Sequence, residues 1–155
     1  MGPGNTPYVA YTLLPNYGPP AMIGLATVAQ QQQACIDATE ELDSYFRGRY
    51  ALPLLAWGSD VVKMAAYIAL KNIAELVGYA PQAGSDSNIR TQYYQVVGWP
   101  DRPGSGWGPG VQKQAIHPDV TPSVAPGQDP GHDVPQVFSA PQRGWTNRLG
   151  PQRVG

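Results

Sequence analysis

Apolar side chains recur at spacings of three, four and seven residues between Val28 and Arg49. This is the period of an amphipathic α-helix, and the charged and amide side chains fall on the opposite face. Asp43 and Arg47 stand four residues apart, so we expect them to pair on the helix surface. Pro53 bars any continuation of the helix. The apolar stripe consists of Val28, Cys35, Ala38, Leu42, Tyr45 and Phe46.

A second helix is predicted between Ser59, a good N-cap, and Gly78, a residue suited to the position after a helix. Apolar positions cover most of the circumference of Val61–Val77, which is typical of a helix buried on more than one side. Alanines such as Ala65 and Ala69 would let a neighbouring helix approach closely. The second buried side faces either another subunit or the interior of a monomeric bundle, and the composition favours neither.

Shorter elements are predicted on both sides of these two helices. The N-terminal segment, residues 1–27, has Gly- and Pro-interrupted stretches that suit a short helix or turn at Tyr11–Asn16 and another at Pro20–Thr27. A third helix is predicted at Ser87–Val97. Because the connections are short, the helices are expected to be antiparallel. The fold class is therefore mainly α, with a small antiparallel helical bundle over residues 28–99.

The composition changes abruptly at residue 100. Residues 100–155 contain ten Pro and nine Gly, and their apolar residues are spaced too thinly for a second core. The sequence therefore predicts a long Pro/Gly-rich extended C-terminal arm that becomes ordered on assembly. Large apolar side chains of the arm and its boundary are expected to fill pockets on partner surfaces. They are Trp99, Trp107, Phe138, Trp145 and Leu149.

Charge narrows the classes of partner. The chain has 10 basic and 11 acidic residues in 155, a formal net charge of −1. This balance excludes the basic footprint of a protein that reads duplex DNA. The most apolar stretch, Val61–Val77, contains Lys63, Lys71 and Glu75, so we expect no membrane span.

Candidate catalytic groups are sparse. His117 and His132 both lie in the predicted arm, without a second Cys or His at zinc spacing. No Gly-x-Ser-x-Gly nucleophile elbow is present. The single cysteine, Cys35, falls on the apolar stripe of the first long helix. We therefore expect a protein that is not an enzyme and that uses no cofactor and no metal.

One stretch is specific enough to suggest a family. Residues 34–54 read ACIDATEELDSYFRGRYALPL. They resemble the helix-to-loop segment of the Mu-type phage head–tail adaptor family, in which an acidic, Ala-rich helix is followed by a Tyr, a Gly/Arg-Tyr step and a Leu-Pro-Leu. A mostly apolar helix follows in that family, as Val61–Val77 does here. The matching residues are Tyr45, Gly48, Arg49, Tyr50, Leu52, Pro53 and Leu54.

The end of the chain resembles the same family. Residues 138–150, FSAPQRGWTNRLG, are similar to its short aromatic and basic closing motif. The resemblance covers residues 28–97 well and the two ends loosely. Residues 100–137 depart from it, because they are longer and richer in Pro and Gly. The matching residues of the closing motif are Phe138, Arg143, Trp145, Arg148 and Leu149.

The resemblance implies a structural virion protein, a head-to-tail adaptor located in the neck and assembled in the host cytoplasm. Copies of the chain, twelve in the family, would form a homo-oligomeric ring below the portal protein and extend the DNA channel. The ring would dock a stopper or tail-completion protein, while genome DNA passes through without sequence-specific binding. The expected subunit or partner interface residues are Tyr45, Arg49, Tyr50, Leu52, Pro53, Leu54, Ala65, Ala69, Phe138, Arg143, Trp145, Arg148 and Leu149.

Two other functions are compatible with parts of the sequence. A soluble protein-binding module could use the Pro-rich arm to recruit a non-viral partner, although no P-x-x-P core with adjacent basic residues is obvious. A nucleic-acid-binding protein is a further alternative, for which the balanced charge predicts negligible retention on DNA at physiological salt.

Overall fold

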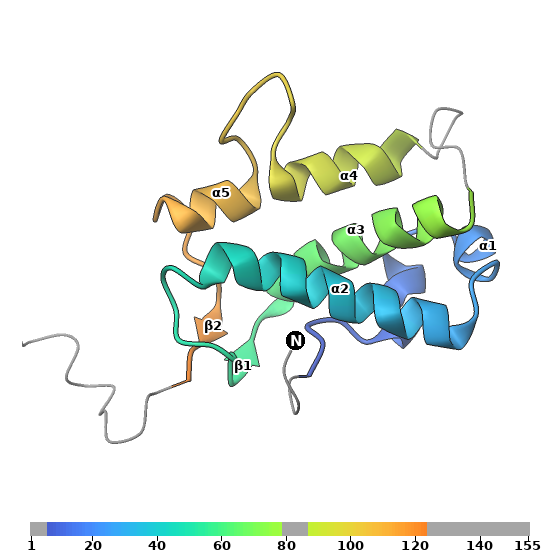
Figure 1. Ribbon diagram of the computed structural model, residues 1–155, viewed down its shortest axis with the longest axis horizontal. Helices are drawn as coiled ribbons and strands as arrows, with labels where there is room; N and C mark the ends of the chain where they lie inside the picture. Colours follow the sequence, from blue (N-terminus) through green and yellow to red (C-terminus); the bar gives the residue numbers. More distant parts are fainter. Residues whose placement is uncertain (1–5, 79–86, 124–155) are drawn as a thin grey trace, which may run out of the picture. The chain divides into compact units, whose positions relative to one another are not determined.

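The computed structural model describes residues 6–78 and 87–123, which fold as a mainly helical unit (Figure 1). Helix α3 runs antiparallel to both α2 and α4, so the predicted fold class is confirmed for this part of the chain (Figure 1). A two-stranded antiparallel sheet pairs Ala56 with Thr121 and Trp57 with Val120. In chain order the elements are η1 (Tyr11–Asn16), α1 (Pro20–Ile23), α2 (Val28–Phe46), β1 (Ala56–Trp57), α3 (Ser59–Leu76), α4 (Ser87–Val97), α5 (Trp107–Gln112) and β2 (Val120–Thr121).

Helix α2 starts at the predicted residue because a capping box fixes its first turn. Thr27 Oγ1 accepts a hydrogen bond from the Gln30 backbone N–H at 3.2 Å, and Gln30 Oε1 accepts one from the Thr27 N–H at 2.9 Å. The helix ends at Phe46, three residues before the end predicted from the apolar pattern. The backbone N–H groups of Arg49 and Tyr50 both bond to the Phe46 carbonyl, which closes the helix in a turn well before Pro53.

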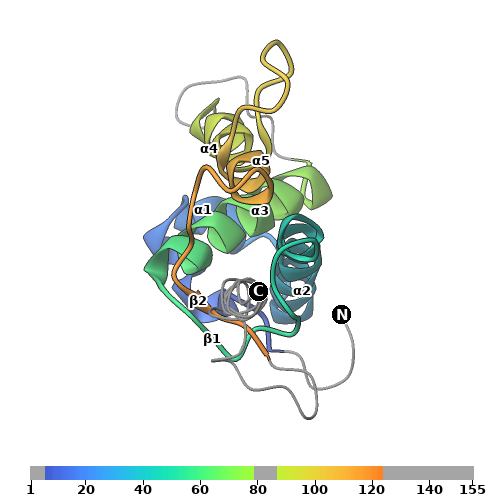
Figure 2. The same ribbon diagram turned by 90° about the vertical axis from the view of Figure 1, so that its left-hand side faces the viewer.

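Helix α3 is the centre of the unit. It packs against α2 on one side and α4 on another, and η1 and α1 also contact it (Figure 2). Ala65 and Ala69 are 0% exposed within their own chain. The central-helix interpretation is therefore the one that the structure supports, and a neighbouring subunit does not reach these two alanines. Gly78 follows the helix with φ +72, as predicted, whereas the N-cap is Gly58 rather than Ser59.

Residues 100–123 differ from the prediction of an extended arm. Helix α5 packs on α2 and α4, with Val111 fully buried, and β2 pairs with β1. Close approach explains this packing, because a Cβ atom on Gly108 would lie 2.7 Å from the ring of Tyr45. Trp107, expected to fill a pocket on a partner, instead packs on Phe46 of its own chain at 5.9 Å between ring centroids. The glycines thus allow a short helix to dock, where we had expected them to keep the chain extended.

The remaining part of the predicted arm, residues 124–155, lies outside the described residues. The closing motif lies there too, so its predicted interface role stays a prediction. The residues concerned are Phe138, Arg143, Trp145, Arg148 and Leu149.

The two ends of the loop between α4 and α5 pass close to each other at two glycines, a contact called the crossing below. Gly98 and Gly106 both have φ +105, in the region that side chains other than glycine rarely adopt. A Cβ atom on Gly106 would lie 2.4 Å from the Gly98 backbone nitrogen, and one on Gly98 would lie 2.2 Å from the Ser105 carbonyl oxygen. The hydrogen bond from the Trp99 N–H to Ser105 Oγ, at 3.0 Å, holds the crossing together. This crossing sets the position of α5 relative to α4.

We predict that Gly106→Ala destabilises the protein by about 2 kcal/mol or more, because it adds both backbone strain and a backbone clash. Gly48→Ala is the matched control, since Gly48 has open space around its Cα and a φ outside the positive region. The control should leave stability unchanged or raise it by about 0.4–1 kcal/mol. Urea unfolding followed by circular dichroism measures both values, and equal effects of the two substitutions would contradict the prediction.

Candidate functional site

The segment that follows α2, residues 45–54, holds the α5 region onto the rest of the unit. The Arg49 guanidinium donates hydrogen bonds to the carbonyl oxygens of Val111, at 3.0 Å, and Ile116, at 2.9 Å. A second guanidinium nitrogen of Arg49 lies 2.8 Å from His117 Nδ1. The Arg49 guanidinium thus donates to carbonyl oxygens both at the end of α5 and in the turn that follows it. Its planar, forked shape with several N–H donors suits this role.

Aromatic rings surround the last residue of α2. Phe46 is fully buried and makes edge-to-face contacts with Tyr8, Tyr50 and Trp107, at centroid distances of 5.9, 6.1 and 5.9 Å. These three rings come from the N-terminal segment, the loop after α2 and the start of α5. Edge-to-face packing adds to the free energy gained by burying the rings. The cluster therefore joins three segments that are far apart in the sequence.

The residues that the family resemblance singled out are thus placed mainly inside the unit. Leu54 is buried, and the Tyr45 ring lies against Gly108 of α5. Arg49 is occupied by backbone carbonyls, and the side chains of Tyr50 and Leu52 are half-buried against the core. Pro53 is exposed, so it remains available for contact with another protein.

Asp43 is a buried anchor rather than a member of the surface ion pair predicted with Arg47. Its carboxylate accepts a hydrogen bond from the Tyr8 hydroxyl, and Tyr8 is further held by Thr39 Oγ1 and by the indole N–H of Trp57. Burial raises the pKa of Asp43, while the Tyr8 hydrogen bond and the charge of Arg47 partly offset that effect. The periodicity of α2 does not predict the burial of Asp43, because the N-terminal segment around Tyr8 covers it and helical periodicity carries no information about that segment.

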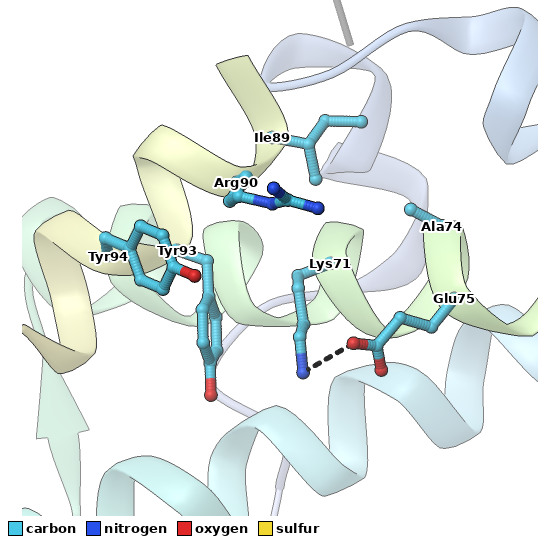
Figure 3. A pocket seen from close by; sticks show the side chains of 7 residues that line it. All are labelled: Lys71, Ala74, Glu75, Ile89, Arg90, Tyr93 and Tyr94. Atoms are coloured by element: carbon cyan, nitrogen blue, oxygen red, sulfur yellow. Dashed lines mark ion pairs between the residues drawn. The ribbon is translucent and has the colours of Figure 1, made fainter. Parts of the chain in front are cut away.

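A groove of about 590 Å³ runs between α3 and α4 (Figure 3). The basic side chains of Lys71 and Arg90 both extend into it, one from each helix. Tyr93 and Tyr94 form an aromatic wall on the α4 side. The lining is therefore amphipathic, with two basic side chains against one carboxylate. Its residues are Lys71, Ala74, Glu75, Ile89, Arg90, Tyr93 and Tyr94.

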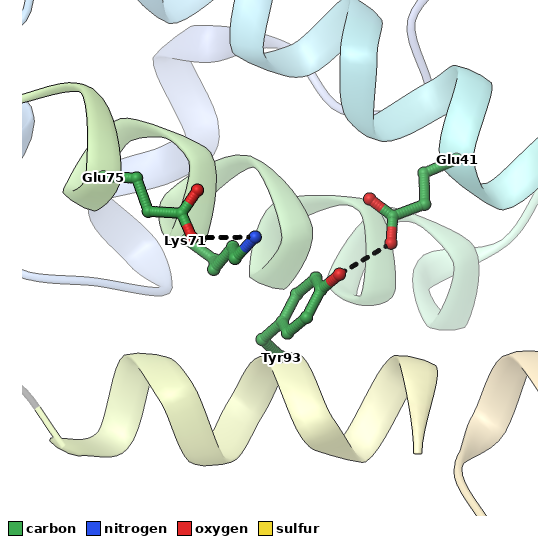
Figure 4. A network of polar contacts seen from close by, with 4 residues as sticks. All are labelled: Glu41, Lys71, Glu75 and Tyr93. Carbon is green, nitrogen blue, oxygen red and sulfur yellow. Dashed lines mark hydrogen bonds and ion pairs between the residues drawn. The ribbon is translucent and has the colours of Figure 1, made fainter. Parts of the chain in front are cut away.

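Polar contacts hold two of the side chains that line this groove, Tyr93 and Lys71 (Figure 4). The Tyr93 hydroxyl donates a 2.9 Å hydrogen bond to Glu41 Oε1 on α2, and burial together with the charge of Glu41 raises the pKa of Tyr93. Lys71 Nζ lies 2.9 Å from Glu75 Oε1 and 4.5 Å from the centre of the Tyr93 ring. The sequence pattern places the charged side chains of α2, Glu41 among them, on the face opposite its apolar stripe. The contact between Tyr93 and Glu41 could not be predicted, because these residues lie on different helices and are separated by 52 positions.

Large apolar side chains remain exposed at two places in the unit. Leu25, in the turn before α2, and Val28, its first residue, are 65% and 52% exposed, and Leu76 at the end of α3 is 55% exposed. Leu55, directly before β1, is 65% exposed. The first three belong to element ends that Figure 1 shows on the right, while β1 lies at the lower left. Contiguous exposed apolar patches mark contact surfaces, whereas single exposed side chains are common on monomers.

Comparison with known proteins gives the family. The chain matches the protein family described as Bacteriophage Mu, Gp36, over residues 14–101, more than half of its length. The chain therefore belongs to that family and is a phage protein of the Mu type. This confirms the part of the expectation that concerned its phage origin and Mu type. No curated protein and no solved structure matches the chain.

Within the residues that the structure describes, two further findings bear on the kind of site. None of the helices there is long and apolar enough to cross a membrane. The same residues contain no group of three or more His, Cys, Asp or Glu side chains placed to hold a metal ion.

We predict that Arg49→Ala lowers the free energy of unfolding by about 2 kcal/mol, because two partly buried carbonyl groups lose a charged donor. Arg49→Lys should recover little of this loss, since an ammonium group cannot reach three acceptors in the same geometry. Arg47→Ala, at an exposed position two residues away, is the control and should change stability by less than about 0.5 kcal/mol. Urea unfolding and limited proteolysis between residues 107 and 121 measure the effect. Wild-type protease resistance in Arg49→Ala would contradict it.

We predict that Asp43 makes the protein less stable as the pH rises. Its folded-state pKa is raised, so the folded state binds more protons than the unfolded state above pH 3.8, the ordinary value of the group. The contribution is therefore fully present below that pH and is lost as the pH rises through the folded-state pKa. Asp43→Asn should flatten the fall in urea midpoint that begins as the pH rises above 3.8, while keeping an acceptor for Tyr8.

Asp37→Asn, on the exposed face of the same helix, controls for the loss of one carboxylate. Parallel pH profiles of wild type and Asp43→Asn would contradict the assignment.

Proposed function

We propose that this protein is a structural subunit of the virion neck, a head-to-tail adaptor that forms a ring below the portal protein. Membership in the Bacteriophage Mu Gp36 family, over residues 14–101, is the observation that carries the proposal. In this role twelve copies extend the DNA channel and dock the next neck protein, a stopper or tail-completion protein. In this proposal the protein catalyses no reaction, and genome DNA passes through the ring without sequence-specific contact.

The surface of the described unit supports a ring. A closed ring of identical subunits needs heterologous contacts, in which one patch of each copy meets a different patch of the next. Exposed apolar side chains lie at element ends on opposite sides of the unit, Val28 and Leu76 on one side and Leu55 on the other. Exposed apolar side chains at two separate places are compatible with such an arrangement.

The low charge of the chain is compatible with a channel. A formal net charge of −1 offers little attraction for phosphate groups, so DNA in the lumen would slide rather than bind. The exposed face of α2 carries Asp37 and Glu40 and is a candidate lining for the lumen. Tight, salt-dependent DNA binding would be a disadvantage during genome ejection.

The test removes the gene from the phage and supplies the protein from a plasmid. We expect DNA-filled heads and free tails to accumulate without the protein, and joined particles to return with the wild-type chain. Leu55→Glu should fold normally, because the side chain is exposed, but lower the yield of joined particles by more than about tenfold, since it places a charge in a subunit contact.

Thr91→Glu, which adds the same charge at an exposed position on α4, is the matched control and should complement like wild type. Electron microscopy of negatively stained lysates counts joined particles, heads and tails. Normally joined particles in the absence of the protein would refute the adaptor role.

A further inference from the structure

We propose that the groove between α3 and α4 binds the Pro-rich acidic segment of a neighbouring copy of this chain, residues 124–137. The inference rests on the proposed ring, because it names one contact by which adjacent copies would be joined. It concerns a surface that lies apart from residues 45–54.

The chemistry of the groove suits a proline-rich chain. Tyr93 and Tyr94 present aromatic surface, and Ile89 and Ala74 supply an apolar floor (Figure 3). Proline rings pack well on such surfaces, and proline-rich segments lose little conformational entropy on binding, since their backbone is already restricted. Lacking an N–H group, each proline also leaves no donor unsatisfied when it is buried. Tyr93 is held in place by Glu41, so the aromatic wall is formed before any partner arrives.

Charge selects which part of the chain would bind there. Residues 124–137 contain Pro126, Pro130 and Pro135 together with two acids, Asp129 and Asp133, and no Lys or Arg. The groove presents Lys71 and Arg90 against the single carboxylate of Glu75. The pair between Lys71 and Glu75 is exposed on the Glu side, so it is weak and easily exchanged for another carboxylate.

The basic end of the chain does not fit the same groove. Residues 143–155 contain Arg143, Arg148 and Arg153 without any acid, and would meet like charge at Lys71 and Arg90. Opposite charges therefore favour residues 124–137 as the occupant over the last thirteen residues of the chain.

The path of the chain points to a neighbouring copy. The described chain ends at Ser123, two residues after β2, and both views show α3 between α4 and β2 (Figures 1 and 2). The chain's own groove opens on the side of α3 that faces α4, away from this exit, so we place the groove of a head-to-tail neighbour there. A contact of this kind is heterologous, as a ring requires.

The experiment places one cysteine in the groove and one in the segment of the same full-length chain, Glu75→Cys and Gln128→Cys. Both substitutions leave Lys71, Arg90 and the two aspartates intact. The native Cys35 needs no replacement, because it is buried and burial raises the pKa of its thiol to about 12. Mild oxidation of the purified protein, followed by a non-reducing gel, then reports which chains were joined.

We expect a ladder of covalent oligomers from this double variant. Gln95→Cys with Gln128→Cys is the position control, since Gln95 is exposed on α4 but does not line the groove, and it should remain largely monomeric. Adding Arg90→Glu to the groove variant should lower the yield of oligomers about fivefold, as expected for reversing one exposed pair. Adding Thr91→Glu, the charge control, should leave the yield unchanged.

Two results would overturn the inference. One is a fast-migrating monomer with an internal disulfide, which would show that the segment binds its own chain. The other is an equal ladder from the Gln95→Cys control, which would show random collision. The adaptor role is read separately from joined particles: a phage with Arg90→Glu that joins its tails normally, together with no ladder, would refute the groove contact and leave the proposed function standing. Tails joined without the protein would refute the function, whatever the gel shows.

Discussion

The burial of Phe46 holds the described unit together. Its ring lies at the end of α2 and is enclosed by Tyr8, Tyr50 and Trp107, which belong to three other segments. A small domain conceals a modest share of its surface, so one shared aromatic cluster carries much of its cooperativity. If this ring were removed, the N-terminal segment, the loop after α2 and α5 would lose their common contact at once. The cluster thus complements α3, which packs on α2 and α4.

Around this cluster, polar groups specify geometry more than they add stability. Arg49 fixes the end of α5 through backbone carbonyls, and Asp43 fixes the N-terminal segment through Tyr8. Burying a carboxylate is costly, and the raised pKa of Asp43 expresses that cost. The benefit is directional, because a hydrogen bond to a buried acid allows few alternative positions of Tyr8. The family motif around Arg49 and Tyr50 is thus explained in part by the needs of folding, before any partner is considered.

The sequence predicts the local elements well and the long-range contacts poorly. The bounds of η1 and α4 were predicted correctly, because apolar periodicity and Gly or Pro punctuation are local signals. The docking of α5 was missed, since its small contact surface depends on Gly108 meeting Tyr45 across more than sixty positions. In the candidate site, the basic and aromatic residues of the groove were individually visible, whereas their convergence was not. Ala65 and Ala69 show the converse error, because small residues indicate close packing without indicating which chain supplies the neighbour.

The short pairing of β2 with β1 has a consequence for whatever lies beyond Ser123. Its hydrogen bonds, from Leu55 to Thr121 and from Gly58 to Asp119, tie the chain to a fixed point on the unit. In general, tethering a binding segment to a fixed point raises its effective concentration near adjacent surfaces, to the millimolar range for a short flexible linker. Individually weak contacts made by such a segment can therefore be well occupied. A four-residue sheet thereby fixes the point on the unit at which the last part of the chain begins.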